Sequence, residues 1–370
     1  MRVLFQSRTT LFSVPGGDTV QILKTKEFLE RLGANVAIST ELEPDLADYD
    51  LVHLFNLIRP QEVLAQARNA RRQGRKITLS TIYGLYTEYD RKARGGIGGL
   101  LSRSLSTGQT EYLKTLARAG KNREFHRGTL QYLRCGHLGA QREIVSLVDV
   151  FLPNSEGEKG RVLTDFPGAA GKPFVIVPNA VDTHLFDSEA TEIAPELEPY
   201  RGCVLCVARI EGRKNQLNLV RAMQGLPWSL VLAGKPAPNH LDYYEQIRRE
   251  AGPNVHFHGQ LDHALLPALY KVARVHVLVS WMETPGLSSL EAAAMGCALV
   301  VTDRGDTREY FEDYASYCEP DSVESIRAAI LKAYERPADP RLRQRVRQEF
   351  NWQKTAEKTL EAYRLALGMI

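Results

Sequence analysis

Short apolar runs alternate with helix-length amphipathic stretches along almost the whole sequence, and this alternation constrains the fold more than any other feature. The runs are rich in Val, Ile and Leu and are bounded by Gly, Pro, Asn or Asp, which is typical of β-strands. They lie at residues 2–7, 35–40, 51–55, 76–81, 149–155, 173–179, 202–208, 229–234, 255–259, 275–280 and 298–303. Near-continuous apolar strands separated by helices predict parallel sheets covered on both faces, so we expect an α/β fold.

The length of 370 residues suits two domains of ordinary size. The stretch 178–202 has neither strand nor helix periodicity and is rich in turn residues and acids, so we expect the seam between the domains there, with a hinge at 173–178. We therefore divide the chain into an N-terminal domain, 1–175, and a C-terminal domain, 176–352. Two such domains predict a cleft at the carboxyl ends of both sheets, where open α/β folds bind ligands.

Composition limits the class of protein. Hydrophobic residues make up 44% and charged residues 25%, as in globular proteins with a real core. No run of about 18 uncharged apolar residues is present, and the first residues predict a strand rather than a signal peptide. We expect a cytoplasmic protein. Cys203 and Cys206 have CxxC spacing, but they lie in an apolar run without a second ligand pair, so we expect buried thiols rather than a zinc site.

Basic residues gather between Arg91 and Arg134, where ten Lys or Arg face two Asp or Glu, although the whole chain has a formal charge of only +3. This asymmetry favours an anionic partner or surface. Three interpretations stay open: a peripheral contact with anionic lipid headgroups, an anionic glycan, and a helical face that is merely solvated. We expect no nucleic-acid partner.

The segment 277–303, VLVSWMETPGLSSLEAAAMGCALVVTD, carries the strongest chemical signal. It predicts a strand, a loop with Glu283 and Gly286, and a helix from about Ser288 to Met295. A glycine before a helix start lets unpaired backbone N–H groups approach an anion. The alternative is a capping box, in which the Glu291 side chain folds back onto the Ser288 amide.

The second signal is VARIEGRKNQ, residues 207–216, in which Arg209 ends a strand while Arg213 and Lys214 open the next helix. Cations at a helix N-terminus oppose the helix dipole unless an anion lies between them. The alternative is a pair between Arg209 and Glu211 beside two solvated cations. A third signal is the turn at Gly16 and Gly17, which lacks the spacing of a dinucleotide or P-loop motif but permits close approach to a phosphate or sugar.

Together these segments resemble the family 4 retaining glycosyltransferases, part of the glycosyltransferases group 1, which have the GT-B fold of two Rossmann-like domains. The donor motif of that family corresponds to ETPGLSSLE at 283–291, its phosphate-binding pair to Arg209 and Lys214, and its Gly-Gly loop to Gly16 and Gly17. PNAVD at 178–182 and the closing segment 350–367 also match. The resemblance runs in order along much of the chain, with a gap between Tyr86 and Leu147.

The resemblance implies a role for each matching residue. Arg209, Lys214 and Glu283 would be catalytic: the two cations would hold the donor diphosphate, and Glu283 would face the transferred sugar. The other residues implied in donor binding are Gly16, Gly17, Lys235, Leu261, Asp262, Gly286, Leu287, Ser288 and Glu291. Residues 353–370 would form a helix that packs back on the N-terminal domain. Tyr83 stands where the family often has a histidine, so we expect it on the acceptor side.

The function implied is retaining sugar transfer from a UDP- or GDP-sugar to a hydroxyl of a glycan or lipid-linked acceptor, in cell-surface polysaccharide or glycoconjugate synthesis. The nucleotide sugar would be a substrate, and we expect neither a metal nor another cofactor. We expect a cytoplasmic location, peripheral at the inner membrane face if the basic stretch binds lipid. The alternatives are a nucleotide-sugar epimerase or hydrolase of the same fold, and a non-catalytic sugar-nucleotide-binding partner.

Overall fold

The computed structural model describes residues 1–84, 86–93, 105, 107–122 and 127–370, and it divides the chain into two compact units. Of the described residues, unit 1 contains 1–84, 105, 107–122, 127–179 and 352–370, and unit 2 contains 86–93 and 180–351. Residues 86–93 thus lie in unit 2, whereas the sequence-based division assigns all of 1–175 to the first domain. Among the described residues, no helix is long and apolar enough to cross a membrane.

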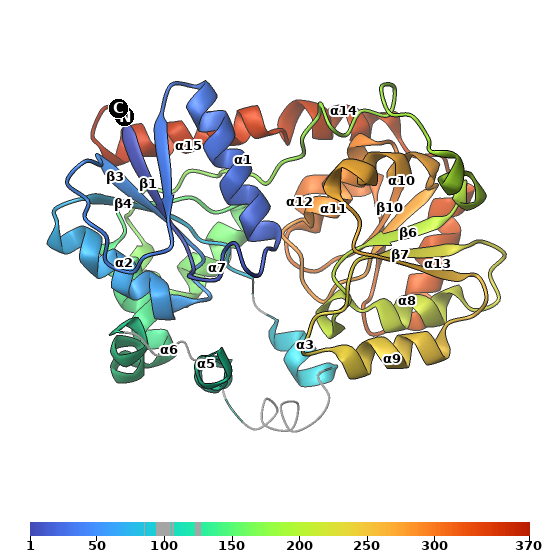
Figure 1. The fold of residues 1–370 in the computed structure, drawn as a ribbon, viewed down its shortest axis with the longest axis horizontal. Helices are drawn as coiled ribbons and strands as arrows, with labels where there is room; N and C mark the ends of the chain where they lie inside the picture. The colour runs from blue at the N-terminus through green and yellow to red at the C-terminus, as the bar shows by residue number, and fades with distance from the viewer. Residues whose placement is uncertain (85, 94–104, 106, 123–126) are drawn as a thin grey trace. The chain divides into compact units, whose positions relative to one another are not determined.

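Unit 1 is built on a five-stranded sheet in the order β2-β1-β3-β4-β5, and all of these strand pairs are parallel. The strands are β1 (Arg2–Gln6), β2 (Asn35–Ser39), β3 (Leu51–Phe55), β4 (Lys76–Ser80) and β5 (Val150–Phe151). The helices are α1 (Gly17–Arg31), α2 (Pro60–Arg72), α5 (Thr107–Asn122), α6 (Arg127–Leu147), α7 (Glu156–Asp165) and α15 (Trp352–Ala366). Helices α1 and α15 cover one face of the sheet, and α2 and α6 cover the other (Figure 1).

The strand expected at 173–179 is reduced to an isolated bridge between Phe174 and Phe151. Three backbone hydrogen bonds still tie it to the sheet edge, from Phe151 N to Pro173 O, from Val175 N to Phe151 O and from Val177 N to Pro153 O. The prolines at 173 and 178 lack the N–H groups that a regular ladder would need. This segment therefore extends along β5 without becoming a full strand.

The closing helix α15 lies in unit 1. Its Tyr363 is fully buried, and the hydroxyl is hydrogen-bonded to His53 Nδ1 of β3 at 2.6 Å. His53 Nε2 is in turn 2.9 Å from Ser80 Oγ at the end of β4. A buried polar network of this kind fixes one position for the helix, because an unpaired polar atom there would be costly.

Unit 2 has a six-stranded parallel sheet in the order β11-β10-β9-β6-β7-β8. Its strands are β6 (Val204–Val207), β7 (Leu230–Ala233), β8 (Val255–Gly259), β9 (Val275–Leu278), β10 (Ala298–Thr302) and β11 (Ser316–Cys318). Its helices are α3 (Thr87–Lys92), α8 (Gln216–Met223), α9 (Leu241–Glu250), α10 (Leu266–Val272), α11 (Leu287–Ala294), α12 (Thr307–Phe311), α13 (Val323–Glu335) and α14 (Pro340–Glu349).

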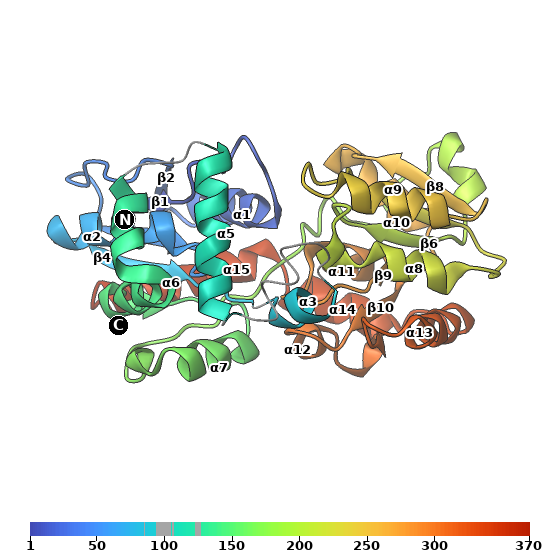
Figure 2. The same ribbon diagram turned by 90° about the horizontal axis from the view of Figure 1, so that it is seen from below.

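Two apolar clusters hold the unit 2 sheet between its helices. Helices α10, α11 and α14 contribute to one cluster, and α8, α9 and α13 contribute to the other (Figures 1 and 2). Cys203 lies in the first and Cys206 in the second, and both thiols are free. Burial raises the pKa of each to about 12. The CxxC pair therefore consists of inert core thiols, as expected.

Candidate functional site

In each of the two sheets the order of the strands reverses at one point. In unit 2, strand β6 pairs with β7 on one side and with the later strand β9 on the other, so the order of the chain reverses between β6 and β9. Open α/β sheets bind ligands at the carboxyl ends of the strands beside such a reversal. The loops that follow β6 and β9 carry Lys214 and Glu283 respectively, and these two side chains form an ion pair. The structure thus joins two of the predicted catalytic residues.

A short turn after β6 presents Lys214. Residues Gly212–Lys214 form a 3-10 turn, and Asn215 follows in the left-handed conformation with φ 61°. The buried Asn215 side chain donates to the backbone oxygens of Val279, at 3.2 Å, and Pro320, at 2.7 Å. The expectation that Arg213 and Lys214 open a helix is wrong, because α8 begins only at Gln216. The two cations directly precede Asn215, the N-cap of α8, and the carboxylates of Glu211 and Glu283 offset their charge there.

Neighbouring charges hold Lys214 and Arg213 in their charged forms. Burial alone would lower the pKa of Lys214, but the Glu283 carboxylate outweighs it and raises the pKa above the usual range. Arg213 donates to Glu211 Oε1 at 2.8 Å, and its guanidinium lies 4.5 Å from the centre of the Tyr86 ring. Burial would raise the pKa of the Glu211 carboxyl, but Arg213, Lys214 and Arg209 together lower it. Glu211 thus forms its hydrogen bond with Arg213, and Arg209 still acts on it through its charge. Arg209 is half-buried, and its carbonyl accepts from Gln216 Nε2 at 2.9 Å.

Close backbone contacts fix the Glu283 loop. The Glu283 carbonyl accepts from Asp306 N at 2.9 Å and lies against Gly305, where an added Cβ would come within 2.0 Å of it. Gly286, with φ 90°, is the N-cap of α11, and a Cβ there would lie 2.6 Å from Leu278 Cδ2. Only glycine satisfies both the backbone conformation and the available space at Gly286 and Gly305. Leu287 and Ser288, the first residues of α11, are half-buried beside this loop.

Glu291 does not form the capping box that we considered. The N-cap of α11 is Gly286, so Ser288 lies inside the helix, and no side chain caps this end. Glu291 instead accepts a hydrogen bond from Tyr270 Oη at 2.9 Å, and its other oxygen is 3.2 Å from His263 Nε2. Burial raises the pKa of Tyr270 well above the usual value, and the Glu291 carboxylate adds to this effect. The carboxylate is therefore held by a neutral phenol and a histidine that no sequence motif indicates.

The remaining predicted donor residues of unit 2 follow β7 and β8 at the same edge of the sheet. Lys235 is exposed directly after β7. Leu261 is half-buried and packs against the apolar cluster of α10 and α11. Asp262 is exposed and caps the turn at 263–265 by accepting from Ala264 N at 3.1 Å. Among the described residues, none of these three forms a hydrogen bond or an ion pair with Lys214 or Glu283.

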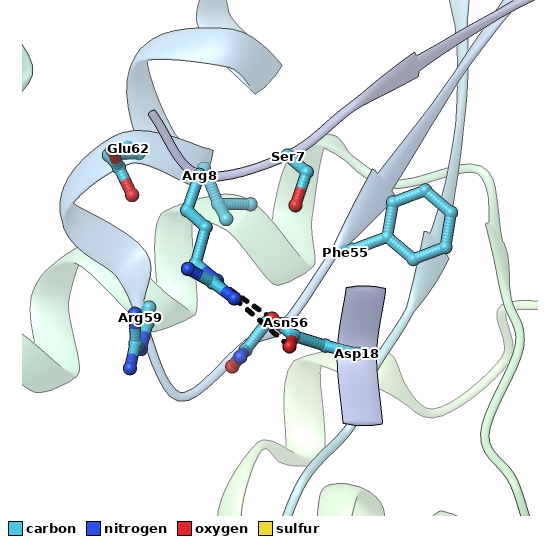
Figure 3. Close-up of a pocket in the computed structure, with 8 residues that line it drawn as sticks. Ser7, Arg8, Asp18, Phe55, Asn56, Arg59 and Glu62 are labelled. Atoms are coloured by element: carbon cyan, nitrogen blue, oxygen red, sulfur yellow. Dashed lines mark hydrogen bonds and ion pairs between the residues drawn. The ribbon is translucent and has the colours of Figure 1, made fainter. Parts of the chain in front are cut away.

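In unit 1 the corresponding reversal lies between β1 and β3, and a small pocket opens there (Figure 3). Arg8 and Asp18 form an ion pair in its lining, in which the guanidinium donates twice to the carboxylate, at 2.8 and 3.1 Å. Arg59 lowers the pKa of Asp18 together with Arg8, although burial opposes both. The lining residues are Ser7, Arg8, Asp18, Phe55, Asn56, Arg59, Glu62 and Val63. Gly16 and Gly17 precede Asp18, as the N-cap and first residue of α1.

Tyr83 also belongs to unit 1, and it points into the protein interior. It is only 3% exposed, it packs edge-on against Phe166, and its hydroxyl donates to Asp165 at 2.8 Å. Burial raises the pKa of the phenol far above its usual value, and Asp165 raises it further. Tyr83 therefore exposes no group that could serve the expected acceptor-side role, and its contacts are those of a packing residue.

Sequence reasoning missed several polar residues of both sites. Arg8 lies two residues after β1 and Arg59 is the N-cap of α2 after β3, so the topology would have indicated them had strand order been known. Tyr270 and His263 gave no signal, because they reach Glu291 only through the folding of α10 against α11. Tyr86 lay in the gap of the resemblance.

Comparison with solved structures defines the class of protein. The structure of sucrose-phosphate synthase from Thermosynechococcus elongatus matches all of this chain and all of its own, with a TM-score of 0.75 and 16% sequence identity. The Anabaena protein HepE in complex with UDP-glucose gives a TM-score of 0.68 at 14% identity, over 98% of this chain and 99% of the other. At this level of identity the likeness concerns the fold. The chain has the GT-B fold of two Rossmann-like units.

Sequence comparison then gives a family match. Residues 190–351 match the family model of the glycosyl transferases group 1. The O-antigen chain mannosyltransferase B of Escherichia coli is 28% identical over 190 residues, which are 47% of this chain and 50% of that protein. The chain thus spans about half the length of this relative. Assignment to family 4 stays a prediction.

Proposed function

We propose that this protein is a retaining glycosyltransferase that moves a sugar from a UDP- or GDP-sugar to a hydroxyl of a glycan or lipid-linked acceptor. The ion pair between Lys214 and Glu283 carries the proposal, because it stands at the strand-order reversal of a domain that matches the family model of the glycosyl transferases group 1. Synthesis of a cell-surface polysaccharide or glycoconjugate is the process that we infer.

The roles of the donor-site residues follow from their charge and position. Lys214, with Arg209 on the same loop, binds the donor diphosphate and stabilises the negative charge that grows on it as the bond to the sugar breaks. Glu283 faces the sugar and holds Lys214 in place between turnovers. Glu291 accepts hydrogen bonds from the ribose hydroxyls, while Tyr270 and His263 fix its two oxygens. The backbone N–H groups at the start of α11 add positive potential.

In the proposed reaction every bond that forms or breaks, and the proton that moves, belongs to the donor or the acceptor. The acceptor oxygen forms a bond to the anomeric carbon on the face that the leaving diphosphate vacates, so the configuration is retained. The bond between the anomeric carbon and the diphosphate oxygen breaks, and the acceptor proton passes to that oxygen. As part of the proposal, Lys214 and Arg209 supply the positive charge that a metal would otherwise provide.

The small pocket of unit 1 suits one hydroxyl group of an acceptor. Two arginines and two carboxylates line it, so its charges nearly balance, and carboxylates and Asn56 offer acceptors for sugar hydroxyls. We assign the acceptor to this pocket rather than to Tyr83, because Tyr83 is buried.

Binding and product analysis test the proposal. The midpoint temperature of thermal unfolding should rise with one class among UDP-, GDP- and ADP-sugars, because a ligand that binds only the folded state stabilises that state. The selected donor is then incubated with hydroxyl acceptors, and the anomeric configuration of the product is read by NMR. Retention supports the proposal and inversion contradicts the retaining mechanism. Nucleotide released without any acceptor would favour the epimerase or hydrolase alternative, and stabilisation by no nucleotide sugar would refute donor binding.

Contact with an anionic membrane is a second, separable proposal. The described parts of α5 and α6 expose Leu113, Leu130 and Leu138 near basic residues, a combination found at membrane interfaces. The basic stretch is divided, however, since Lys92 lies in unit 2 and pairs with Asp321. Arg94, Arg103 and Arg123 fall outside the described residues. After sedimentation with phosphatidylserine vesicles at low salt, the protein should be found in the vesicle pellet. Protein that stays in the supernatant would refute the membrane contact.

A further inference from the structure

Helix α3 follows β4 of unit 1 in the chain but lies in unit 2, against the loops that carry the candidate donor site (Figures 1 and 2). Two ion pairs attach it. Glu88 accepts from Arg304 at 2.8 Å, and Lys92 donates to Asp321 at 2.8 Å. Arg304 immediately precedes Gly305, the residue against which the Glu283 carbonyl rests. One end of α3 is thus connected to the loop that contacts Glu283.

Helix α3 also contacts the turn that presents Lys214. Tyr89 lies so close to Gly212 that an added Cβ would meet its hydroxyl at 2.3 Å and its Cζ at 3.0 Å. Gly212 is not among the glycines with positive φ, so its backbone conformation is open to any residue. The lack of a side chain at Gly212 is therefore explained by Tyr89.

Aromatic contacts complete the link between the two loops. The Tyr86 ring, just before α3, lies under the Arg213 guanidinium at 4.5 Å. The Tyr89 ring is 6.3 Å from the Trp281 ring, and Trp281 N donates to the Arg213 carbonyl at 3.0 Å. Trp281 is two residues before Glu283. Residues 86–92 therefore contact both loops on which the Lys214–Glu283 pair depends.

We propose that α3 is a clamp that positions the Gly212–Lys214 turn and the Glu283 loop for an anionic ligand, with Tyr86, Glu88 and Tyr89 as positioning residues. The inference rests on the proposed donor site, and the anion is the diphosphate of a nucleotide. Without the clamp, Arg213 loses the ring beneath it and the turn loses its packing partner, so the cations spread over more conformations and bind a diphosphate less tightly.

Paired substitutions at the contact between Tyr89 and Gly212 test the clamp. Titration calorimetry with UDP and GDP gives the dissociation constants, and thermal unfolding reports folding separately. Gly212→Ala should weaken binding by about tenfold or more, because a displacement of about 1 Å at a binding loop has effects up to about 100-fold. Tyr89→Phe removes the atom of the closest contact, so Gly212→Ala in the Tyr89→Phe background should bind several times more tightly than Gly212→Ala alone.

A milder variant keeps the test decisive if Gly212→Ala does not fold. Glu88→Gln removes the charge that pairs with Arg304 and should weaken binding about two- to fivefold, as expected for a partly exposed pair. Glu198→Gln is the matched control, since it breaks the exposed Arg201–Glu198 pair of unit 2 and should leave binding unchanged.

Each outcome of the titration has one meaning. Weaker binding with Glu88→Gln and rescue of Gly212→Ala by Tyr89→Phe support the clamp. Unchanged binding in the α3 variants overturns it, and tighter binding overturns it as well, because α3 would then obstruct the site. If the wild-type protein binds neither nucleotide, the proposed function fails and the clamp fails with it, a result that the wild-type titration alone identifies.

Discussion

Gly305→Ala tests whether the position of the Glu283 loop controls function. Gly305 has φ 79°, and a Cβ there would lie 2.0 Å from the Glu283 carbonyl oxygen and 2.8 Å from Met282 Sδ. Since real Cβ atoms stay beyond 3.0 Å, the Glu283 backbone must shift by about 3.0 − 2.0 = 1.0 Å, a displacement that costs up to about 100-fold in rate. A 100-fold loss in kcat/KM corresponds to about 2.7 kcal/mol of transition-state stabilisation.

The matched control is Gly296→Ala. Gly296 has φ 86°, close to that of Gly305, but an added Cβ would meet nothing within 4 Å. Both variants carry the strain of a positive φ, which is about 1–2 kcal/mol of folding free energy. Only Gly305→Ala should also lose sugar transfer, measured as kcat/KM with the selected donor, while chemical unfolding shows both proteins folded. Equal activity in the two variants would refute the reasoning.

Three further predictions concern the interior of the two units. Burial lowers the pKa of His53 and His276 to about 3, so between pH 6.5 and 3 each histidine binds a proton in the unfolded chain but not in the folded one. The free energy of unfolding should therefore fall by about 2 kcal/mol per histidine between neutral pH and pH 5. Urea unfolding of His276→Leu, which keeps only His53, should show about half of the decrease seen in the wild type. Tyr363→Phe leaves His53 Nδ1 without its partner and should cost about 1–3 kcal/mol, with faster hydrogen exchange in α15; unchanged exchange would contradict the docking network. Tyr83→Phe removes the bond to Asp165 and should cost about 1 kcal/mol of stability without changing KM for the acceptor, whereas a raised KM would restore its acceptor role.

Much of the fold could be predicted from the sequence because it rests on local patterns. All of the predicted apolar runs except 173–179 became strands of two parallel sheets. The closing helix was also expected, but its attachment through Tyr363 and His53 was not, because it joins residues 310 positions apart. Pairings of that kind leave no periodic trace in a single sequence.

The candidate site was predicted in part, and the errors have physical causes. Lys214 and Glu283 were expected to act together, and they form an ion pair. Glu291 was also fitted by a local capping rule, yet tertiary packing gave it Tyr270 as a partner. Helix α3 could not be placed from sequence, because its short polar segment is held by ion pairs to residues more than 200 positions away.

The account depends most directly on Lys214 as the cation that binds a nucleotide diphosphate. Calorimetric titration of the selected nucleotide into Lys214→Met should give a dissociation constant about 10- to 150-fold above that of the wild type, the range for a lost hydrogen bond to a charged group. Arg221→Met is the control, because Arg221 forms a comparable ion pair with Glu250 at 2.7 Å on α8, outside the site. The account predicts that this control binds as the wild type does. Equal binding by wild type and Lys214→Met would contradict the assignment of the donor site.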